Sequence, residues 1–567
     1  QRQMCIRDRY SIGLDFGTLS GRALLLNLET GEELASAVCD YPHGVMDREM
    51  PWGEKLPPDW ALQHPEDYLE VLYRTIPAVL KESGVPPEDI VGVGTDFTAC
   101  TALPVRKDGV PLCFLPEFAQ NPHAYVKLWK HHAAQDKADR ITALARLRGE
   151  AWLQDYGGRV SSEWMFPKLW QLAEEAPELY GAMYRFVEAA DWIVWQLTGN
   201  ETCSACSAGY KAFWNQCSGY PAPDFFKALG PKMEHAAEKL GKVISPLGER
   251  AGGVTAEMAH RTGLREGTAV SVGNVDAHVC VPAAGISGPG KLLAILGTST
   301  CHMVLGTEGK RVPGVCGMVK DGILPGYFGF EAGQSCVGDL FSWFLNACLP
   351  ASCREEAFAR GKSLHEYLRE KAQKLKPGES GLLALDWWNG NRSILTDGDL
   401  TGLLLGMTLQ TRPEELYRAL IEATAYGTRI LVENYREHGV PVEEFVAAGG
   451  ISRKDPMTMQ IYADVLNMPV LIVGTHQGSA FGSALFGAVA AGRENGGFSH
   501  ILEAAERLGK RGNTVYDPIP EHTAVYDRLY GEYKQLHDYF GRGGSNVMKR
   551  LKALSREQKQ KEQNFQP

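Results

Sequence analysis

Long apolar runs are absent from this sequence: no segment approaches the roughly 18 continuous apolar residues of a membrane-spanning helix. The first nine residues also lack the apolar core of a secretion signal. They fit poorly with the apolar segment that follows, so we expect residues 1–9 to be a disordered or non-native leader. Excess positive charge is missing as well, because 58 Lys and Arg residues face 68 Asp and Glu residues, a net charge of −10. These absences argue against a membrane protein or a general nucleic-acid binder, and they favour a cytoplasmic location.

Metal-ligand patterns are scarce. The 13 cysteines are scattered, mostly among apolar residues, which is typical of reduced, packed thiols. Cys203 and Cys206 form a single C-x-x-C pair, but no second pair and no His pair at zinc-finger spacing accompanies it. We therefore expect neither a structural zinc nor a redox centre at this pair.

What the sequence does contain is one motif that occurs twice. Residues 10–28 read as an apolar strand, an Asp-Phe-Gly-Thr turn and a second apolar strand, and residues 291–305 repeat this plan around Gly-Thr-Ser. Two strands joined by a tight turn of glycine and hydroxyl residues form a hairpin. The backbone N–H groups and hydroxyls of such turns can converge on phosphate oxygens. Two of these hairpins predict two related domains that face one polyphosphate, as in a phosphotransferase.

The remainder of the chain alternates strands and helices. Before the glycine-rich segment 285–291 we expect a helix from about residue 64, a strand over 90–96 with 98–105 as its neighbour, and a strand over 269–273. Between these strands, residues 120–200 are expected to be mainly helical, with amphipathic stretches at 126–134, 168–176 and 189–197. After the segment 285–291 we expect strands over 327–331 and 444–448 and helices over 413–437 and 478–492. This alternation on both sides of 285–291 predicts two α/β domains with mixed sheets.

Two glycine patterns fail as nucleotide motifs. The segment from Gly285 to Lys291 resembles a P-loop, but Leu292 stands where the Ser or Thr should follow, and the next residues predict a strand where a P-loop opens a helix. The pair Gly92 and Gly94 lacks the third glycine of a dinucleotide fingerprint, because Phe97 stands there. Phosphate binding is therefore expected at the two hairpin turns.

The first turn carries groups suited to a phosphoryl group and a metal ion. Asp15, at the end of the first strand, can hold Mg²⁺ through water. Thr18, Ser20 and Arg22 can surround the phosphoryl group that is transferred. The alternative is a plain hairpin with a capped turn.

Two further positions are candidates for the reaction. Asp276 follows a buried strand, where a carboxylate can orient a substrate hydroxyl and accept its proton late in a loose phosphoryl-transfer transition state. The alternative for Asp276 is that it caps a helix. For His278, a structural role is favoured over a catalytic one. Gly449 and Gly450, between a strand and a helix, would let the adenosine or α-phosphate of a nucleotide approach the backbone.

In their order along the chain, four of these motifs resemble those of the FGGY carbohydrate kinases: Asp15–Thr18, Gly273–Asp276, Gly297–Ser299 and Ala447–Ser452. The resemblance covers about residues 10–545. Within the family, five further runs are most similar to the branch that phosphorylates L-ribulose: Gly94–Thr101, Lys127–Gln135, Glu163–Lys168, Ala208–Trp214 and Gly329–Ser335.

The resemblance implies an α/β fold of two actin-like, ribonuclease H-like domains with mixed sheets flanking a central catalytic cleft. It implies an N-terminal sugar-binding domain over 10–286, a C-terminal nucleotide-binding domain over 287–545 and a polar tail over 546–567. The implied activity is ATP-dependent phosphorylation of the 5-hydroxyl of L-ribulose in arabinose breakdown, with ATP and Mg²⁺ as cofactors. It leaves open whether the chain forms a homodimer.

The resemblance also implies roles for single residues. Asp276 stands at the position of the catalytic base and, with Asp15, of the metal site. The implied substrate contacts are the Ala99 backbone, Trp129, Lys211, Asp276 and Glu331. The implied nucleotide contacts are Gly297 and Thr298 for phosphate, with Gly338 and Gly450 toward the adenosine.

Three alternatives remain at this stage. Another FGGY kinase, acting on D-ribulose, xylulose or a polyol, would use the same machinery with different sugar contacts. An actin-like or chaperone ATPase would share the hairpins but would have no use for Trp129, Lys211 and Glu331. A catalytically inactive sugar sensor would not need both hairpins and Asp276 intact.

Overall fold

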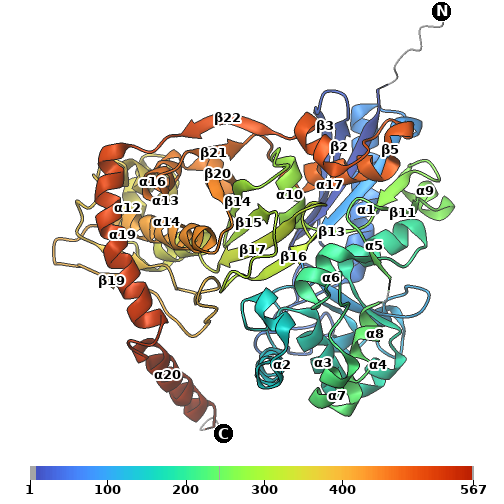
Figure 1. Cartoon of the computed structure of the whole chain (residues 1–567), viewed down its shortest axis with the longest axis horizontal. Coiled ribbons are helices and arrows are strands. Elements are labelled where there is room, and N and C mark those ends of the chain that lie inside the picture. The colour runs from blue at the N-terminus through green and yellow to red at the C-terminus, as the bar shows by residue number, and fades with distance from the viewer. Residues whose placement is uncertain (1–7, 242, 565–567) are drawn as a thin grey trace, which may run out of the picture.

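The computed structural model describes residues 8–241 and 243–564, and the first seven residues of the expected leader lie outside this range. Arg9, the last residue of that expected leader, pairs with Asp89 at 3.6 Å between Nη1 and Oδ1. The described residues build two lobes, each around a mixed sheet of seven strands (Figure 1). Among the helices of the described residues, none is both long enough and apolar enough to cross a bilayer.

The two large sheets repeat one plan. The first has the order β11-β12-β5-β1-β2-β3 with β13 also paired to β5, and the second has the order β16-β17-β15-β14-β20-β21-β22. The strands of the first are β1 (Tyr10–Phe16), β2 (Ser20–Asn27), β3 (Glu33–Asp40), β5 (Ile90–Phe97), β11 (Arg250–Gly253), β12 (Ala269–Ser271) and β13 (Asn274–Val275). Those of the second are β14 (Gly290–Leu296), β15 (Thr300–Gly306), β16 (Gly317–Lys320), β17 (Phe328–Gln334), β20 (Val442–Ala448), β21 (Val470–Val473) and β22 (Arg511–Tyr516).

The predicted hairpins form the centre of both sheets. β1 pairs antiparallel with β2 and parallel with β5, and β14 pairs antiparallel with β15 and parallel with β20. Because β14 begins at Gly290, Lys291 lies within a strand, which agrees with the rejection of a P-loop there.

Two local predictions are wrong. The segment 98–105 contains β6 (Ala102–Val105), which does not lie next to β5 but belongs to a separate sheet of order β4-β7-β6-β8. The stretch 126–134 contains β7 (Val126–Lys127) followed by turns where a helix was expected. Both segments are short, and their conformation is set by pairing with strands distant in sequence, which local periodicity does not report. The remaining strands are β4 (Leu62–Gln63), β8 (Arg185–Glu188), β9 (Cys203–Ser204), β10 (Ile244–Ser245), β18 (Leu383–Leu385) and β19 (Leu403–Leu405).

The helices of the first half surround its sheets. They are α1 (Pro65–Ser83), α2 (Gln135–Arg148), α3 (Met165–Glu175), α4 (Pro177–Ala182), α5 (Ala189–Thr198), α6 (Ala205–Lys211), α7 (Pro223–Leu229), α8 (Ala236–Leu240), α9 (Ala256–Thr262) and α10 (Asp276–Ala283). The helix predicted near residue 64 is α1, where His64 accepts a hydrogen bond as the N-cap and Pro65 occupies the first turn.

The second half has ten more helices among its described residues. They are α11 (Gly338–Trp343), α12 (Ala351–Ala359), α13 (Leu364–Ala372), α14 (Pro413–Glu437), α15 (Gly450–Lys454), α16 (Pro456–Leu466), α17 (Gly478–Ala491), α18 (Ile501–Leu508), α19 (Pro520–Gly541) and α20 (Val547–Asn564). The predicted helix 413–437 matches α14 at both ends, and α20 lies within the expected polar tail over 546–567.

Helix α17 joins the two halves. Although it lies between β21 and β22 of the second sheet in sequence, it packs on β1 and β5 of the first (Figure 1). The contact is so close that a Cβ atom added to Gly94 would lie 1.8 Å from the Ser483 carbonyl oxygen. Together with α10, α17 also fills the apolar core between the sheets, where Val279 and Phe481 pack among residues of both halves. The small residues of α17 therefore allow one helix to bind two sheets.

We predict that Gly94→Ala destabilises the protein, because the added methyl group meets backbone that has no room to move. Overpacking of a core typically lowers the free energy of unfolding by about 1–3 kcal/mol. Because the new methyl group of Gly94→Ala meets backbone atoms, we expect a loss near the upper end of this range. Thermal unfolding measures the change. The control is Gly531→Ala, on an exposed turn of α19 with no atom near the new Cβ, where better helix propensity should leave the melting temperature equal or higher. Equal melting temperatures for the two variants would contradict the close packing of α17.

Candidate active site

The first hairpin turn presents polar groups at the end of β1. The Gly17 N–H donates to the Ser20 carbonyl oxygen at 3.0 Å, which closes the turn around Thr18. Asp15 and Arg22 stand directly opposite each other in the hairpin register, and Arg22 Nε lies 3.2 Å from Asp15 Oδ2. The turn therefore brings one carboxylate, one guanidinium and two hydroxyl residues together.

Thr18 is held from two sides. The Trp129 indole N–H donates to Thr18 Oγ1 at 3.1 Å, and the Gln63 amide donates to the Thr18 carbonyl oxygen at 2.8 Å. The structure thus places Trp129, expected at the sugar, against a residue expected at the phosphate. Ala99, the other expected sugar contact in this region, lies partly exposed in the turn that follows β5.

A second carboxylate, which the sequence analysis did not single out, lies beside Asp15. Asp96 is its direct neighbour in the parallel pairing of β1 with β5, and Ser483 of α17 donates to Asp96 Oδ2 at 2.5 Å. Burial and then the charge of Asp15 raise the pKa of Asp96 well above its ordinary value, and burial also raises that of Asp15. Asp96 Oδ1 is buried without a hydrogen-bond partner. The signal in the sequence was the acidic residue that ends the strand 90–96, but only the sheet register shows that it lies next to Asp15.

Asp276 is the first residue of α10, directly after β13. Its Oδ1 accepts a hydrogen bond from the Ala277 N–H at 2.7 Å. Burial, followed by the charge of Asp15, raises the pKa of Asp276 to about 7. A carboxyl group with this pKa is suited to proton exchange near neutral pH.

Lys211 and Glu331 form a buried ion pair between the two halves. Lys211 ends α6 in the first half, Glu331 lies on β17 in the second, and the Nζ atom is 2.9 and 2.8 Å from the two carboxylate oxygens. Their side chains are only 4% and 6% exposed. His278 Nε2 and Arg392 Nη2 also approach Glu331, at 3.2 and 3.1 Å.

The charges around this pair support its ionised form. Burial alone would raise the pKa of Glu331, but Lys211, His278 and Arg392 hold it well below its ordinary value. Burial alone would lower the pKa of Lys211, but the charge of Glu331 raises it above its ordinary value. Arg392 lies in a loop without any recognisable motif, so the sequence contained no signal for it.

The second hairpin turn is packed against two glycines. The Thr298 carbonyl oxygen accepts from the Val337 N–H at 2.9 Å, and the Gly297 carbonyl oxygen accepts from the Gly338 N–H at 3.0 Å. A Cβ atom at Gly338 would lie 2.6 Å from the Gly297 oxygen, so the approach needs glycine. The turn before Gly450 also lies here, because a Cβ at Gly449 would meet the Leu296 oxygen at 2.4 Å. The structure therefore gathers Gly297, Thr298 and Gly338 beside the Gly449–Gly450 turn.

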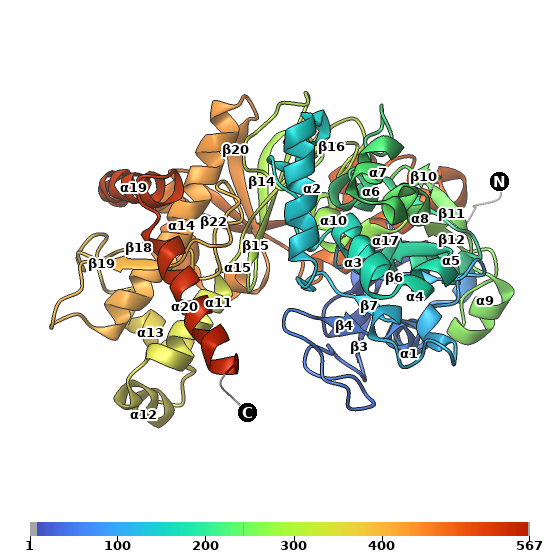
Figure 2. The same cartoon turned by 90° about the horizontal axis from the view of Figure 1, so that it is seen from below.

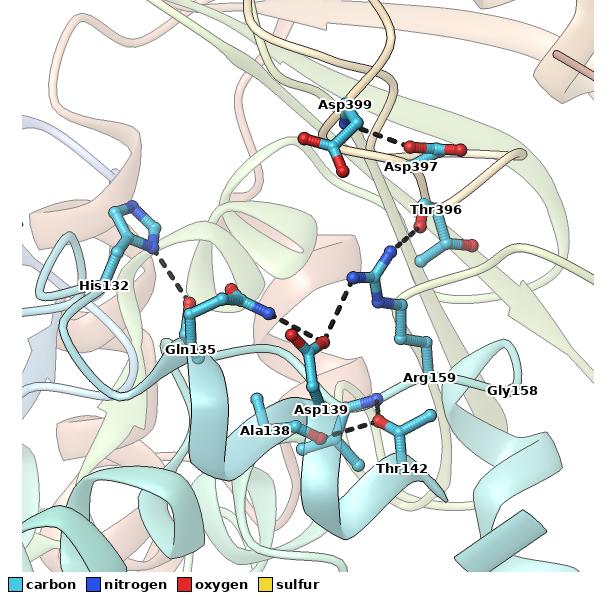
Figure 3. A network of polar contacts seen from close by, with 12 residues as sticks. His132, Gln135, Ala138, Asp139, Thr142, Gly158, Arg159, Thr396, Asp397 and Asp399 are labelled. Carbon is cyan, nitrogen blue, oxygen red and sulfur yellow. Dashed lines mark hydrogen bonds and ion pairs between the residues drawn. The ribbon is translucent and has the colours of Figure 1, made fainter. Parts of the chain in front are cut away.

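The halves meet again away from these turns. Arg159 donates from Nη1 to the Thr396 carbonyl oxygen of the second half at 3.0 Å, and its Nη2 lies 3.2 Å from Asp139 of α2 (Figure 3). A cavity of about 500 Å³ lies here, lined by residues of α2, the 157–159 segment and the 395–397 segment. Figure 2 shows α2 at the border between the two halves.

The C-x-x-C pair is divided between two environments. Cys206 Sγ lies 2.9 Å from His278 Nδ1, whereas the pKa of Cys203 is raised by burial and by Asp191 beside it. Within the described part of the chain, no group of three or more His, Cys, Asp or Glu side chains is arranged to hold a metal ion directly.

Two repeated α/β halves, each built on a central hairpin and joined by a buried ion pair, define the class of two-domain kinases with an actin-like fold. Family models confirm the expectation from the motifs: residues 10–281 match the N-terminal domain and residues 292–491 the C-terminal domain of the FGGY family of carbohydrate kinases. The chain belongs to this family, and it is a sugar kinase.

Curated relatives cover nearly the whole chain. A ribulokinase of Bacillus licheniformis is 59% identical over 94% of this chain and 97% of its own length. A ribulokinase of Mycolicibacterium smegmatis is 50% identical over 96% of both chains. Among solved structures, the xylulose kinase of Rhodospirillum rubrum matches with a TM-score of 0.75 and 25% identity, covering 93% of this chain and 98% of that one. The glycerol kinase of Plasmodium falciparum, at 14% identity and a TM-score of 0.71 over 93% and 98% of the two chains, shares the fold.

We predict that Glu331→Gln lowers the stability of the protein. The substitution keeps the shape but leaves the Lys211 ammonium buried without its main counter-charge, and breaking a buried pair typically costs about 3–5 kcal/mol. Thermal unfolding measures the loss. The control is Glu308→Gln, which removes the exposed pair with Lys310 (2.7 Å between Nζ and Oε2) and should change the melting temperature little. If the two variants unfolded at the same temperature, the pair would not hold the halves together.

Proposed function

We propose that this kinase transfers the γ-phosphoryl group of ATP to the 5-hydroxyl of L-ribulose, the reaction expected of a ribulokinase. The observation that carries the proposal is that Asp276 lies close enough to the buried Lys211–Glu331 pair for both of its charges to act on the Asp276 carboxyl group. Relatives named ribulokinase, 50–59% identical over nearly the whole chain, support this choice of sugar over D-ribulose, xylulose or a polyol. Membership of a carbohydrate kinase family argues against an actin-like or chaperone ATPase.

In this proposal the sugar lies between the halves. Trp129 offers an apolar face to the C–H surface of the sugar, the Ala99 backbone contacts it, and Lys211 and Glu331 bond its hydroxyl groups. Because Lys211 and Glu331 come from different halves, the sugar is bound only where the halves meet. Contact between the halves also excludes water, which competes with the sugar as phosphoryl acceptor.

Asp276 acts as the base. Its carboxylate accepts a hydrogen bond from the 5-hydroxyl and orients the oxygen toward the γ-phosphorus. In a loose transition state the P–O bond to the leaving ADP breaks as the new O–P bond forms, and Asp276 takes the hydroxyl proton late. A pKa of about 7 means that the carboxylate is available at neutral pH and that its conjugate acid can release the proton again.

The two turns hold the polyphosphate. Gly297 and Thr298 contact its phosphates, with the Thr298 hydroxyl as a donor, while the Gly297 N–H closes the turn on the Ser299 carbonyl oxygen. Gly338 and Gly450 lie toward the adenosine, and a Cβ atom added to Gly450 would meet no atom within 4 Å. Thr18, Ser20 and Arg22 contact the phosphoryl group that is transferred. Since the two turns belong to different halves, neither half alone assembles the site.

The acidic groups fit a magnesium ion bound through water. Mg²⁺ prefers one or two carboxylates together with water and substrate phosphates. Asp15 and Asp276 were expected there, and Asp96 adds a buried carboxylate oxygen without a partner beside Asp15. When bound, Mg²⁺ would neutralise charge on the phosphates, while Asp15, Asp96 and Asp276 would hold its water shell.

The proposal also covers the domain boundary, the oligomeric state and the cellular location. We place the boundary between the sugar-binding and nucleotide-binding domains at residues 286 and 287, in the segment between α10 and β14 that neither family model covers. A cytoplasmic location also stays a prediction, and whether the chain forms a homodimer stays open.

We predict that Asp276→Asn lowers kcat by about 10²–10⁴, the usual contribution of a general base, while ATP still binds. The pH profile provides a second reading: kcat/KM of the unmodified enzyme should fall as pH decreases below about 7, because protonation neutralises the Asp276 carboxylate. That acidic limb should vanish in Asp276→Asn. Steady-state kinetics check both, with the exposed Asp108→Asn as control. Near-normal turnover in folded Asp276→Asn would refute its role as base.

We predict that L-ribulose is phosphorylated with a far higher kcat/KM than glycerol. A pocket that bonds several hydroxyl groups discriminates against a substrate that lacks them, because its own buried polar groups are then left unpaired. ATP consumption across a panel of ketopentoses and polyols, with the product position determined by NMR, measures this. If xylulose or glycerol were preferred, the chain would still be a sugar kinase but not a ribulokinase.

A further inference from the structure

One fully buried side chain next to the candidate base has no part in the proposed chemistry. The His278 side chain is 0% exposed and lies between a thiol and a carboxylate. Its Nδ1 atom is 2.9 Å from Cys206 Sγ, and its Nε2 atom is 3.2 Å from Glu331 Oε2. The Tyr210 ring packs against the imidazole at a tilt of 48°, with 4.4 Å between ring centroids. The imidazole is therefore enclosed by Cys206, Glu331 and Tyr210.

The partners of His278 determine which nitrogen carries its proton. An ionised carboxylate only accepts hydrogen bonds, so Nε2, the nitrogen that faces Glu331, carries the proton; at 3.2 Å from Oε2 the two groups are in close contact without meeting hydrogen-bond geometry. Nδ1 of the neutral ring is then an acceptor, and the Cys206 thiol is a donor that can serve it. Burial keeps this thiol protonated by raising its pKa. The imidazole thus accepts a hydrogen bond from Cys206 on one edge and turns its N–H edge toward Glu331 on the other.

These contacts connect the two helices that carry the proposed reaction groups. Helix α6 contains both Cys206 and Lys211, and α10 begins with Asp276 and contains His278. The Cys206–His278 contact therefore joins α6, which carries the proposed sugar contact Lys211, to α10, which carries the proposed base Asp276. The His278–Glu331 contact fixes the same helices to β17 of the other half.

We propose that His278 is a positioning residue for sugar binding and that the Cys206 thiol holds it in the required tautomer. The proposal rests on the proposed role of Lys211 and Glu331 as sugar contacts. Glu331 has two oxygens for Lys211, Arg392, His278 and a sugar hydroxyl. Its orientation toward the sugar therefore depends on where the Nε2–H group of His278 points.

The test uses single substitutions at Cys206 and a matched control in the same motif. Cys206→Ala removes the donor to Nδ1, whereas Cys206→Ser keeps a donor of smaller size. Cys203→Ala removes the other thiol of the C-x-x-C pair, which faces Asp191 and not His278. His278→Phe removes the N–H group that faces Glu331 and serves as a stronger second variant if it folds.

The readouts are KM for the sugar, KM for ATP, kcat, and the Kd of the sugar measured by calorimetry without ATP. A buried polar group left unpaired costs about 1–3 kcal/mol, so we expect Cys206→Ala to raise the sugar KM and Kd by about 5- to 150-fold. KM for ATP should stay within about twofold, since the phosphate turns are untouched. Cys206→Ser should restore most of the sugar affinity, and Cys203→Ala should leave it unchanged.

Three results would overturn the proposal. The first is a sugar KM and Kd for Cys206→Ala equal to those of the unmodified enzyme. The second is an equal loss in Cys206→Ala and Cys206→Ser, or in Cys203→Ala, which would show general damage to the region. The third is a parallel rise of KM for sugar and ATP. The KM and Kd of each variant are divided by those of the unmodified enzyme, measured with the sugar that the unmodified enzyme phosphorylates best. If L-ribulose is not that sugar, the substrate panel of the unmodified enzyme shows it, and the variant-to-unmodified ratios are not affected.

Discussion

The buried ion pair between Lys211 and Glu331 is the contact on which the arrangement of this site depends. Two charges away from water are stable only when each supplies the other with a counter-charge and hydrogen bonds, and here both carboxylate oxygens are used. Since one partner comes from each half, the pair forms only when the halves meet in this relative position. Arg392 adds a donor and His278 lies 3.2 Å away, and together with Lys211 they hold the pKa of Glu331 well below its ordinary value at 6% exposure.

The two sheets around the pair share the same arrangement of a hairpin and a later strand. In each half a hairpin pairs parallel with a later strand, so its turn lies at the same edge of the sheet as the residue that ends that strand. This geometry places Asp96 beside Asp15 in one sheet and the Gly449–Gly450 turn beside the second hairpin in the other. Helix α17 then ties the sheets together through backbone contacts that only small residues allow. The same hairpin-and-strand arrangement in each half thus brings the candidate residues of both halves to the region between them.

Much of this architecture could be predicted from local patterns. Both hairpins, α14 and the helix α1 with its His64 cap follow from turn chemistry and periodicity that act over a few residues. The family and the two-domain actin-like fold also followed, because the motifs occur in a fixed order along the chain. The failures were short segments: β6 and the stretch around β7 are too short for a periodic signal and are decided by their pairing partners.

The sequence by itself determined the two hairpin turns of glycine and hydroxyl residues, the acidic residue at the start of α10 and the family. Only the tertiary structure decided which charges meet: Lys211 with Glu331 and Arg392, Asp15 with Asp96, and His278 with Cys206. It also placed α17, which lies between β21 and β22 of the second sheet in sequence, on the first sheet. The physical reason is range. Turn and helix signals depend on neighbours within a few residues, whereas a hydrogen bond between residues far apart depends on sheet register and helix packing to within a fraction of an ångström.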